Sequence, residues 1–330
     1  MVLIFSEEVE MSTDSVCEWI DYLGGKFERI NGAIFSEKAD RFSYSLTLNR
    51  QADIDFSFEI NGKKLAGKTV NSIWFRRDEP LGNISFFDPI SDVQLRHTLI
   101  SHGHREIVRA KDYFFAVLLQ KPHIGNHLIK EVNKLHTLFI AAKNGLEIPD
   151  SMLSNNVRHQ QAFIKEGPTI NKAVKETDFF RSSTGDVFVS YTSLVNQKDI
   201  SPSGFPSFFQ KKVEKDFELR VFYLKGKFYS MAIFSQADTK TAVDYRRYNL
   251  SKPNRNVPYK LPFYVEEGLR KTMHELGLDN GSIDLIKTTD GKFIFLEVNP
   301  VGQFGMTSKP CNYYIEKEIA QILVSKNPLN

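Results

Sequence analysis

The sequence predicts an α/β (α+β) protein with more than one domain. An apolar strand over residues 1–5 and a helix over residues 12–25 open the chain, and another strand is expected over residues 72–77. Near the other end, two β-hairpins are centred on the turn dipeptides Lys225-Gly226 and Asp290-Gly291. With 330 residues, of which 41% are hydrophobic, the chain is long enough to bury the cores of two or three domains.

The segments between these ends divide the chain into three parts. Apolar residues recur at helical spacing across residues 91–120, so a long helix is expected before a linker at residues 120–126. A helix over residues 128–145, closed by Asn144-Gly145, and a strand over residues 168–174 follow. We therefore predict an N-terminal α/β domain over residues 1–125, a central subdomain over residues 126–208 and a C-terminal subdomain over residues 209–330.

Composition and charge argue against several classes of partner. The net charge is +3, from 43 basic and 40 acidic residues, so nothing requires a nucleic acid. The N-terminus lacks the basic flank of a secretory signal, and no segment approaches the roughly 18 apolar residues of a membrane span. Cys17 and Cys311 form neither a disulfide framework nor a metal-ligand pattern. We expect a cytoplasmic protein with no membrane partner.

The second hairpin brings two acidic residues together. If residues 290–291 form a two-residue turn, Ile286 faces Phe295, and Asp284 falls directly opposite Glu297. Side chains paired in this way have Cβ atoms about 4.5–5.5 Å apart, and like charges there repel each other. Glu297 also interrupts an apolar strand, where an unpaired carboxylate is costly.

A divalent cation would explain this pair of carboxylates. Asn299, two residues beyond Glu297, adds a carbonyl oxygen on the same face of the strand. Carboxylate and amide oxygens are typical ligands of Mg²⁺, which also takes water and substrate phosphates. The alternatives are that one acid is protonated or that the register slips, so that the two acids never meet.

Three basic residues suggest that the metal site is part of a nucleotide site. Arg220 alternates with Phe222 and Leu224 and therefore shares their face of a strand, where a guanidinium needs an anion. Lys172 has a similar position in the strand over residues 168–174, and Lys134 lies early in its predicted helix. Each lysine taken singly would be read as a solvated surface residue. Only their joint occurrence favours a site for phosphate groups.

Several separated segments, in this order, carry a family resemblance. Residues 133–155, 167–174, 208–233, 282–286 and 295–306 together resemble the ATP-grasp ligases, over roughly residues 126–330. Within that superfamily, WFRR, ELRV, DYRR and above all LEVNPVGQFGMTSKPCNYYIEKEIA are similar to the microviridin-type graspetide synthetases of the grasp-with-spasm subgroup. The resemblance implies a nucleotide held between two α+β subdomains, an N-terminal pre-ATP-grasp α/β domain, and a homodimer.

The resemblance also implies roles for individual residues. The metal ligands would be Asp284, Glu297 and Asn299. ATP would be bound by Lys134, Lys172, Asn299 and the hinge residues Gln210, Lys211, Lys212, Val213 and Glu214, although many relatives carry a glutamate at the position of Lys211. The catalytic residues would be Arg220, Lys172 and Arg246. The substrate would be bound by Arg76, Arg77, Arg220 and Arg246.

The implied activity is ATP-dependent, Mg²⁺-dependent ligation of carboxylates. An Asp or Glu side chain of a ribosomally made precursor peptide, composed of a leader and a Thr/Glu-rich core, would be phosphorylated to an acyl phosphate. A Ser or Thr hydroxyl would then close an ester ring, or a Lys amine an amide ring.

Two alternatives are another ATP-grasp ligase, which joins an amino acid to a protein or small-molecule acceptor, and an ATP-binding protein without turnover. A single glycine in KETDFFRSSTGDVF argues against an enzyme like glutathione synthetase.

Overall fold

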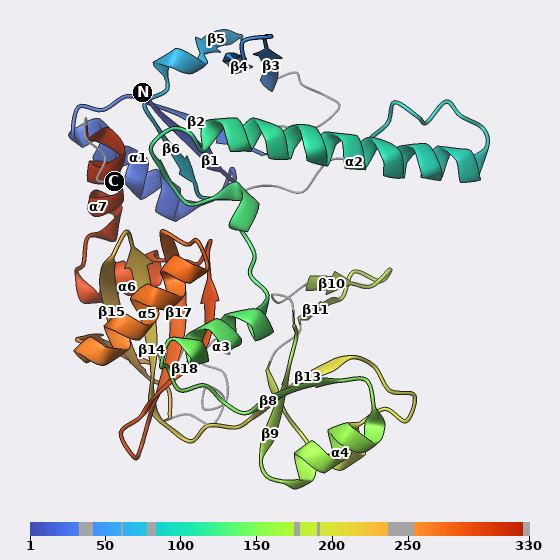
Figure 1. The fold of residues 1–330 in the computed structure, drawn as a ribbon, viewed down its shortest axis with the longest axis vertical. Helices are drawn as coiled ribbons and strands as arrows, with labels where there is room; N and C mark the ends of the chain where they lie inside the picture. Colours follow the sequence, from blue (N-terminus) through green and yellow to red (C-terminus); the bar gives the residue numbers. More distant parts are fainter. Residues whose placement is uncertain are drawn as a thin grey trace. The chain divides into compact units, whose positions relative to one another are not determined.

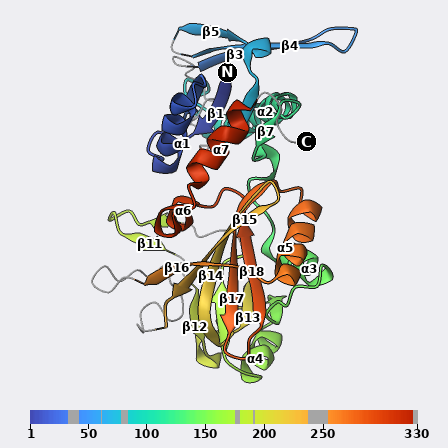
Figure 2. The same cartoon turned by 90° about the vertical axis from the view of Figure 1, so that its left-hand side faces the viewer.

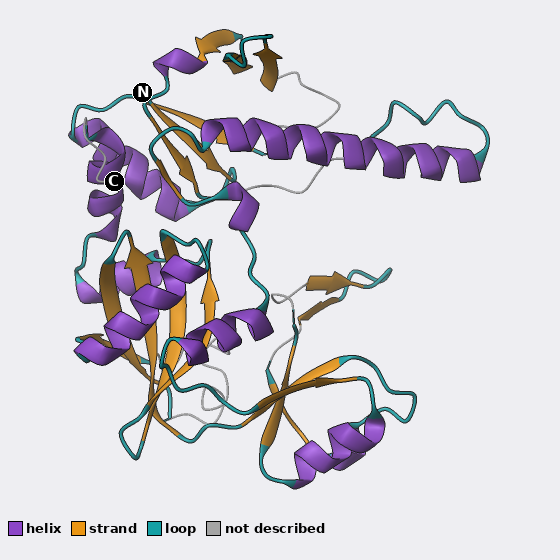
Figure 3. Cartoon of the chain, viewed as in Figure 1, coloured by secondary structure: helices purple, strands orange, loops and turns teal. Residues whose placement is uncertain are grey.

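The chain forms two compact units in the computed structural model. The structure describes residues 1–32, 42–60, 62–77, 84–174, 179–189, 192–236 and 254–325. The first unit comprises Met1–Lys130 together with Tyr314–Asn330, and the second comprises Glu131–Tyr313. Both units combine helices with β-sheets, and the larger sheets of the second unit are antiparallel (Figures 1 and 3). The predicted mixed α/β class is therefore confirmed.

The first unit is an α/β unit built on a parallel sheet. Its elements are β1 (Val2–Ser6), α1 (Met11–Tyr22), β2 (Phe27–Asn31), β3 (Phe42–Leu48), β4 (Ile54–Ile60), β5 (Lys63–Ala66), η1 (Gly67–Thr69), β6 (Ser72–Phe75), α2 (Val93–Leu118), β7 (His123–Ile124), η2 (His127–Ile129) and α7 (Ile315–Val324). The parallel sheet has the order β2-β1-β6-β7, and β3, β4 and β5 form an antiparallel sheet. The C-terminal helix α7 contacts α1 and β6, which explains why the end of the chain belongs to this unit.

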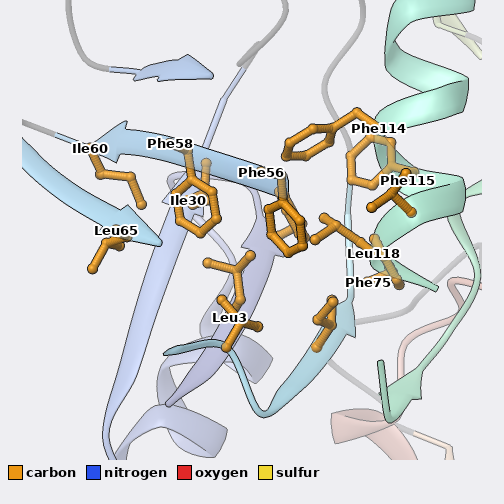
Figure 4. Packing of buried hydrophobic residues seen from close by; sticks show 14 residues of the cluster. Leu3, Ile30, Phe56, Phe58, Ile60, Leu65, Phe75, Phe114, Phe115 and Leu118 are labelled. Carbon is orange, nitrogen blue, oxygen red and sulfur yellow. The ribbon is translucent and has the colours of Figure 1, made fainter. Parts of the chain in front are cut away.

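Aromatic side chains form the core of this first unit. Phe56 and Phe58 of β4 meet Leu3 of β1 and the adjacent pair Phe114 and Phe115 of α2 in one buried cluster (Figure 4). Only the C-terminal part of α2 contributes buried residues, because its N-terminal part extends beyond the sheet (Figure 1). The apolar periodicity across residues 91–120 correctly predicted this helix, and the aromatic residues serve packing, as their alternation with aliphatic residues suggests.

The second unit contains two antiparallel sheets and a short hairpin. Its elements are α3 (Lys134–Lys143), β8 (Ser151–Ser154), α4 (Val157–Lys165), β9 (Thr169–Lys172), β10 (Phe179–Arg181), β11 (Val187–Val189), β12 (Ser193–Val195), η3 (Gln197–Asp199), β13 (Ser207–Lys211), β14 (Lys215–Leu224), β15 (Lys227–Phe234), β16 (Arg255–Tyr259), α5 (Phe263–Glu275), β17 (Asn280–Thr288), β18 (Phe293–Asn299) and α6 (Gly305–Cys311). One sheet has the order β12-β9-β13-β8 and the other β16-β15-β14-β17-β18. Helices α3 and α5 contact each other, and α3 packs against β18 (Figure 2).

Two local predictions in this unit have different outcomes. The first hairpin is confirmed, because Leu224 pairs with Lys227 and the two turn residues have positive φ, 42° at Lys225 and 90° at Gly226. The helix expected over residues 128–145 is wrong in its first part. It begins only at Lys134, because the side chain of Asn133 accepts a hydrogen bond from His136 N and caps the helix there.

No helix in the described part of the chain combines the length and the apolar character needed to cross a membrane.

Candidate active site

The two acidic residues of the second hairpin do face each other, but for a different reason than expected. Near the turn, Ile286 pairs with Ile294 and not with Phe295, so the simple two-residue turn is wrong. A β-bulge at Leu296 then shifts the register by one residue and places Asp284 opposite Glu297. The bulge also lets both Leu296 and Glu297 line the same cavity, which strict alternation would not allow.

Arg220 completes a row of charged side chains across three neighbouring strands. It pairs with Asp284 in the register of β14 and β17, and its Nη1 lies 2.8 Å from each carboxylate oxygen of Asp284. Both side chains are largely buried, with 10% and 17% of their surfaces exposed. The neighbouring strand therefore supplies the anion that the sequence predicted Arg220 would need.

Two lysines approach Glu297 from other elements of the same unit. Lys134 Nζ on α3 lies 3.4 Å from Glu297 Oε2, and Lys172 Nζ on β9 lies 4.0 Å from the same oxygen. Lys134 also donates a hydrogen bond to the carbonyl oxygen of Ala173 at 3.3 Å. The cap at Asn133 places Lys134 in the first turn of α3, which packs on β18. The predicted cations and carboxylates thus meet at one place.

This cluster carries three positive and two negative charges, which suits a phosphate-rich ligand. Arg220, Lys134 and Lys172 outnumber Asp284 and Glu297, so the cluster has a net positive charge before any ligand binds. No three His, Cys, Asp or Glu side chains in the described residues are placed to hold a metal by themselves. A cation would therefore need oxygens beyond the two carboxylates, as Mg²⁺ bound to a nucleotide does.

Asn299 lies on the same strand at the edge of this row. It pairs with Ser282, two residues along from the Asp284–Glu297 pair. Its Oδ1 accepts a hydrogen bond from Val301 N at 2.9 Å, which shapes the turn after β18. An amide oxygen has two lone pairs, so this bond leaves one available to a ligand.

A cavity of about 220 Å³ lies beside the cluster, between the two sheets of the second unit. The four-stranded sheet contributes Ile170, Lys172, Leu194 and Gln210 to its wall, and the five-stranded sheet contributes Glu218, Leu219, Asp284, Leu285, Ile286, Leu296 and Glu297. Lys211 at the end of β13 and the connecting residues Lys212, Val213 and Glu214 line it as well. Apolar and charged side chains line this cavity together, which is appropriate for a nucleotide.

Gln210 has an unsatisfied acceptor in the wall of this cavity. Its side chain is almost fully buried, and its Nε2 donates to Ser151 Oγ at 3.0 Å. Ser151 Oγ already donates its proton to the carbonyl oxygen of Pro149, so it can only accept from Gln210, which fixes the orientation of the amide. Among the described residues, Gln210 Oε1 has no hydrogen-bond partner. A ligand with a donor group, such as an exocyclic amine, would satisfy it.

The other predicted hinge residues differ in the partners that their side chains contact. Lys211 directs its ammonium toward α4, where it donates to the carbonyl oxygen of Phe163 and lies 4.1 Å from the centre of that ring. Lys212 pairs with the exposed Glu214. Val213, between them, contributes to the cavity wall. The backbone N–H groups of Lys211 and Lys212 also have partners, because they donate to the carbonyl oxygens of Asp150 and Pro168 at 2.9 and 2.8 Å.

Sequence reasoning missed a buried ion pair in the cavity wall. Lys215 Nζ lies 2.6 Å from Glu218 Oε1, and Ser235 Oγ donates to Glu218 Oε2 at 2.6 Å. Burial raises the pKa of Glu218 above its usual value, although the hydrogen bonds from Lys215 and Ser235 oppose the shift. The signal was present, because Glu218 stands two residues before Arg220 in ELR and therefore shares its face of β14.

The predicted substrate arginines of the first unit differ in their environments. Arg76 is buried, and its Nη2 lies 3.1 Å from Glu10 Oε1. Burial lowers the pKa of Arg76 to about 10, against the opposing effect of Glu10. Arg77 is only half-buried, and its Nε has no partner among the described residues. Arg246, and Arg247 beside it, lie outside the described residues.

The Arg76–Glu10 pair should contribute to stability, and Arg77 should not. Arg76→Met removes the guanidinium that pairs with the buried carboxylate of Glu10, so we expect the free energy of unfolding to fall by roughly 3–5 kcal/mol. Arg77→Gln should change it by less than about 1 kcal/mol. Urea unfolding followed by circular dichroism measures both. Equal effects of the two substitutions would show that the buried pair has no special role.

Comparisons with known proteins give results only at the level of structure. No protein-family model and no curated protein sequence matches the chain. A solved RiPP-associated ATP-grasp ligase of Chryseobacterium gregarium, in complex with ADP and a leader and core peptide, is similar with a TM-score of 0.84 and 24% identity, over 99% of this chain and 97% of that one. The macrocyclase MdnC of Microcystis aeruginosa, bound with precursor peptide MdnA, is similar with a TM-score of 0.79 and 25% identity, over 98% of this chain and 99% of that one. The ATP-grasp ligase PsnB, complexed with minimal precursor, Mg and ADP, is similar with a TM-score of 0.71 and 16% identity, over 98% of this chain and 96% of that one.

Proposed function

We propose that this chain is an ATP-dependent peptide macrocyclase. Its structural similarity to RiPP ATP-grasp ligases confirms the family resemblance that its sequence shows. It would phosphorylate Asp or Glu side chains of a ribosomal precursor peptide. Ser or Thr hydroxyls, or Lys amines, would then displace phosphate and close ester or amide rings. Its two buried free cysteines agree with a reducing cytoplasm as its location.

One observation carries this proposal: five charged side chains from five elements meet beside a cavity that lies between two sheets. Arg220, Asp284 and Glu297 form a row across β14, β17 and β18, and Lys134 and Lys172 approach from α3 and β9. Phosphoryl transfer requires neutralisation of charge and correct positioning more than it requires a protein nucleophile. The arrangement provides both, and the carboxylate of the substrate is the nucleophile.

The residues of the site can be assigned roles on this basis. Asp284, Glu297 and the free lone pair of Asn299 are a suitable oxygen set for Mg²⁺, which when bound with ATP neutralises phosphate charge. Lys134 and Lys172 can exchange Glu297 for phosphate oxygens, which releases that carboxylate for the metal. Arg220 would stabilise the transferred phosphoryl group, and the backbone near Val213 would bind adenine.

Gln210 should give the site its preference for adenine. Its fixed Oε1 can accept from the adenine amine but would face a carbonyl oxygen in inosine. We expect wild-type protein to bind ATP roughly 10–100-fold more tightly than ITP, and Gln210→Met to lose most of that preference. Titration calorimetry with both nucleotides provides the test. An unchanged ratio of the two dissociation constants in the variant would rule out this role.

The function itself is tested by intact mass. The protein is incubated with ATP, Mg²⁺ and a short candidate precursor that contains Thr and Glu, taken from a reading frame beside its coding sequence. Each ring lowers the peptide mass by one water, about 18 Da, because ester or amide closure is a condensation, and one ADP appears per ring. A gain in mass would identify a ligase that adds a group to its acceptor. ATP binding without ADP release and without any change in peptide mass would identify a protein without turnover.

A further inference from the structure

A second cavity lies in the first unit, at the edge of the parallel sheet where its strands begin. It has a volume of about 480 Å³. Lys26, Lys68 and Lys121 line it, from the segments before β2, in η1 and after α2 respectively. The strands β1, β2 and β6 start here, next to the marked N-terminus (Figure 1). This edge is the opposite one from the carboxyl ends that carry Arg76 and Arg77.

The three lysines are not compensated by neighbouring acids. No Asp or Glu is among the described residues that line the cavity, and none of the three lysines has an ion pair with a described residue. Three positive charges around one cavity raise the local potential and attract anions. An uncompensated cluster of this kind, drawn from three separate segments, points to a ligand that supplies the negative charge.

The backbone holds the three lysines in place. The carbonyl oxygen of Lys26 accepts a hydrogen bond from Val2 N at 2.7 Å, and Lys121 N donates to Leu118 O at 2.9 Å. Lys68 lies inside η1, which is closed by the bond from Val70 N to Gly67 O. Since the backbone is already ordered, the ordering cost of binding on the protein side is confined to the side chains of the lysines.

The remaining lining indicates what kind of anion fits. Val70, Leu323 and Val324 give the cavity an apolar floor, and Asn71 adds an amide. No aromatic side chain among the described lining residues is available to stack on a base. We propose that this basic cavity binds an acidic peptide segment, with carboxylates at the three lysines and an apolar side chain on the floor. The proposal requires neither ATP nor the active site of the second unit.

Fluorescence anisotropy of the full chain tests this proposal without ATP. The probe is a labelled ten-residue peptide of alternating Glu and Leu, and the same peptide with Gln in place of Glu is the ligand control. We expect the triple substitution K26Q/K68Q/K121Q to raise the Kd of the acidic peptide roughly tenfold. The matched variant K165Q/K198Q/K271Q removes the same charge from exposed lysines outside both cavities, and it should change the Kd less than about twofold.

Three outcomes would overturn the proposal. Equal weakening by both triple variants would mean general attraction to a basic protein. Displacement of the peptide by millimolar inorganic phosphate, with loss of phosphate binding in K26Q/K68Q/K121Q, would make the ligand a phosphate and not a peptide. Absence of binding in wild-type protein at about 50 mM salt would mean that the lysines bind no peptide and only stabilise the negative C-terminal end of the α7 dipole. The macrocyclase proposal could still hold in each case, because its mass assay is separate.

Discussion

Replacing Glu297 with Gln should reduce precursor-dependent ADP release roughly a thousandfold or more, since the substitution removes one of two carboxylates available to a metal. The amide keeps the shape of the side chain, so the bulge at Leu296 and the packing of β18 should persist. The rate is measured by coupled ADP detection and by intact mass of the peptide. If Glu297→Gln closes rings at the wild-type rate, the metal assignment is wrong.

The same variant offers a control that does not depend on catalysis. Lys134 and Lys172 lose their carboxylate partner in Glu297→Gln and become available to phosphate oxygens. We therefore expect the variant to bind ADP without Mg²⁺ at least as tightly as the wild type does, and to gain little from added Mg²⁺. Calorimetric titrations with and without the metal separate this result from unfolding, which would abolish binding under both conditions.

Replacing Arg220 with Met should have an equally large effect on rate, together with a loss of stability. Asp284 is then left in a largely buried position without its guanidinium, which should lower the free energy of unfolding by roughly 3–5 kcal/mol. In the proposed site Arg220 would face the transferred phosphoryl group, so removal of its charge should reduce the rate roughly 100–1,000-fold. Urea unfolding and ADP release measure the two effects separately.

The double variant R220M/D284N distinguishes pairing from catalysis. Neutralising Asp284 removes the uncompensated charge, so the double variant should regain a large part of the stability that Arg220→Met loses. Its activity should remain at the level of the slower single variant or below, because both groups would also contact ATP or its metal in the proposed site. Recovery of activity along with stability would mean that the two residues matter only for the fold.

The strand faces that the site residues occupy could be predicted from the sequence, because alternation and turn residues determine them locally. Alternation in ELRVFYL places Arg220 on an apolar face, and a hairpin signal near residues 290–291 brings Asp284 toward Glu297. The separation of the two acids was correct only because a turn longer than expected and a bulge at Leu296 offset each other. A bulge depends on packing against neighbouring strands, which no local pattern specifies.

The partners of these residues came from distant parts of the chain. Glu297 meets Lys134 and Lys172, which lie more than a hundred residues earlier, and the orphaned oxygen of Gln210 depends on a bond between Ser151 and Pro149. The buried pair of Arg76 and Glu10 shows the same limit. The resemblance implied the same role for Arg76 and Arg77, yet Arg76 is buried and Arg77 is half-buried.

By itself the sequence determined the mixed α/β class, the two hairpins and which acidic and basic side chains occupy faces of strands, because these follow from short-range periodicity and turn chemistry. Only the tertiary structure decided which charges neutralise one another, which acceptor remains unsatisfied, and that three lysines of the first unit surround one cavity. Those properties depend on contacts between segments far apart in the chain, and their energies follow from burial, which is known only once the sheets and helices have packed.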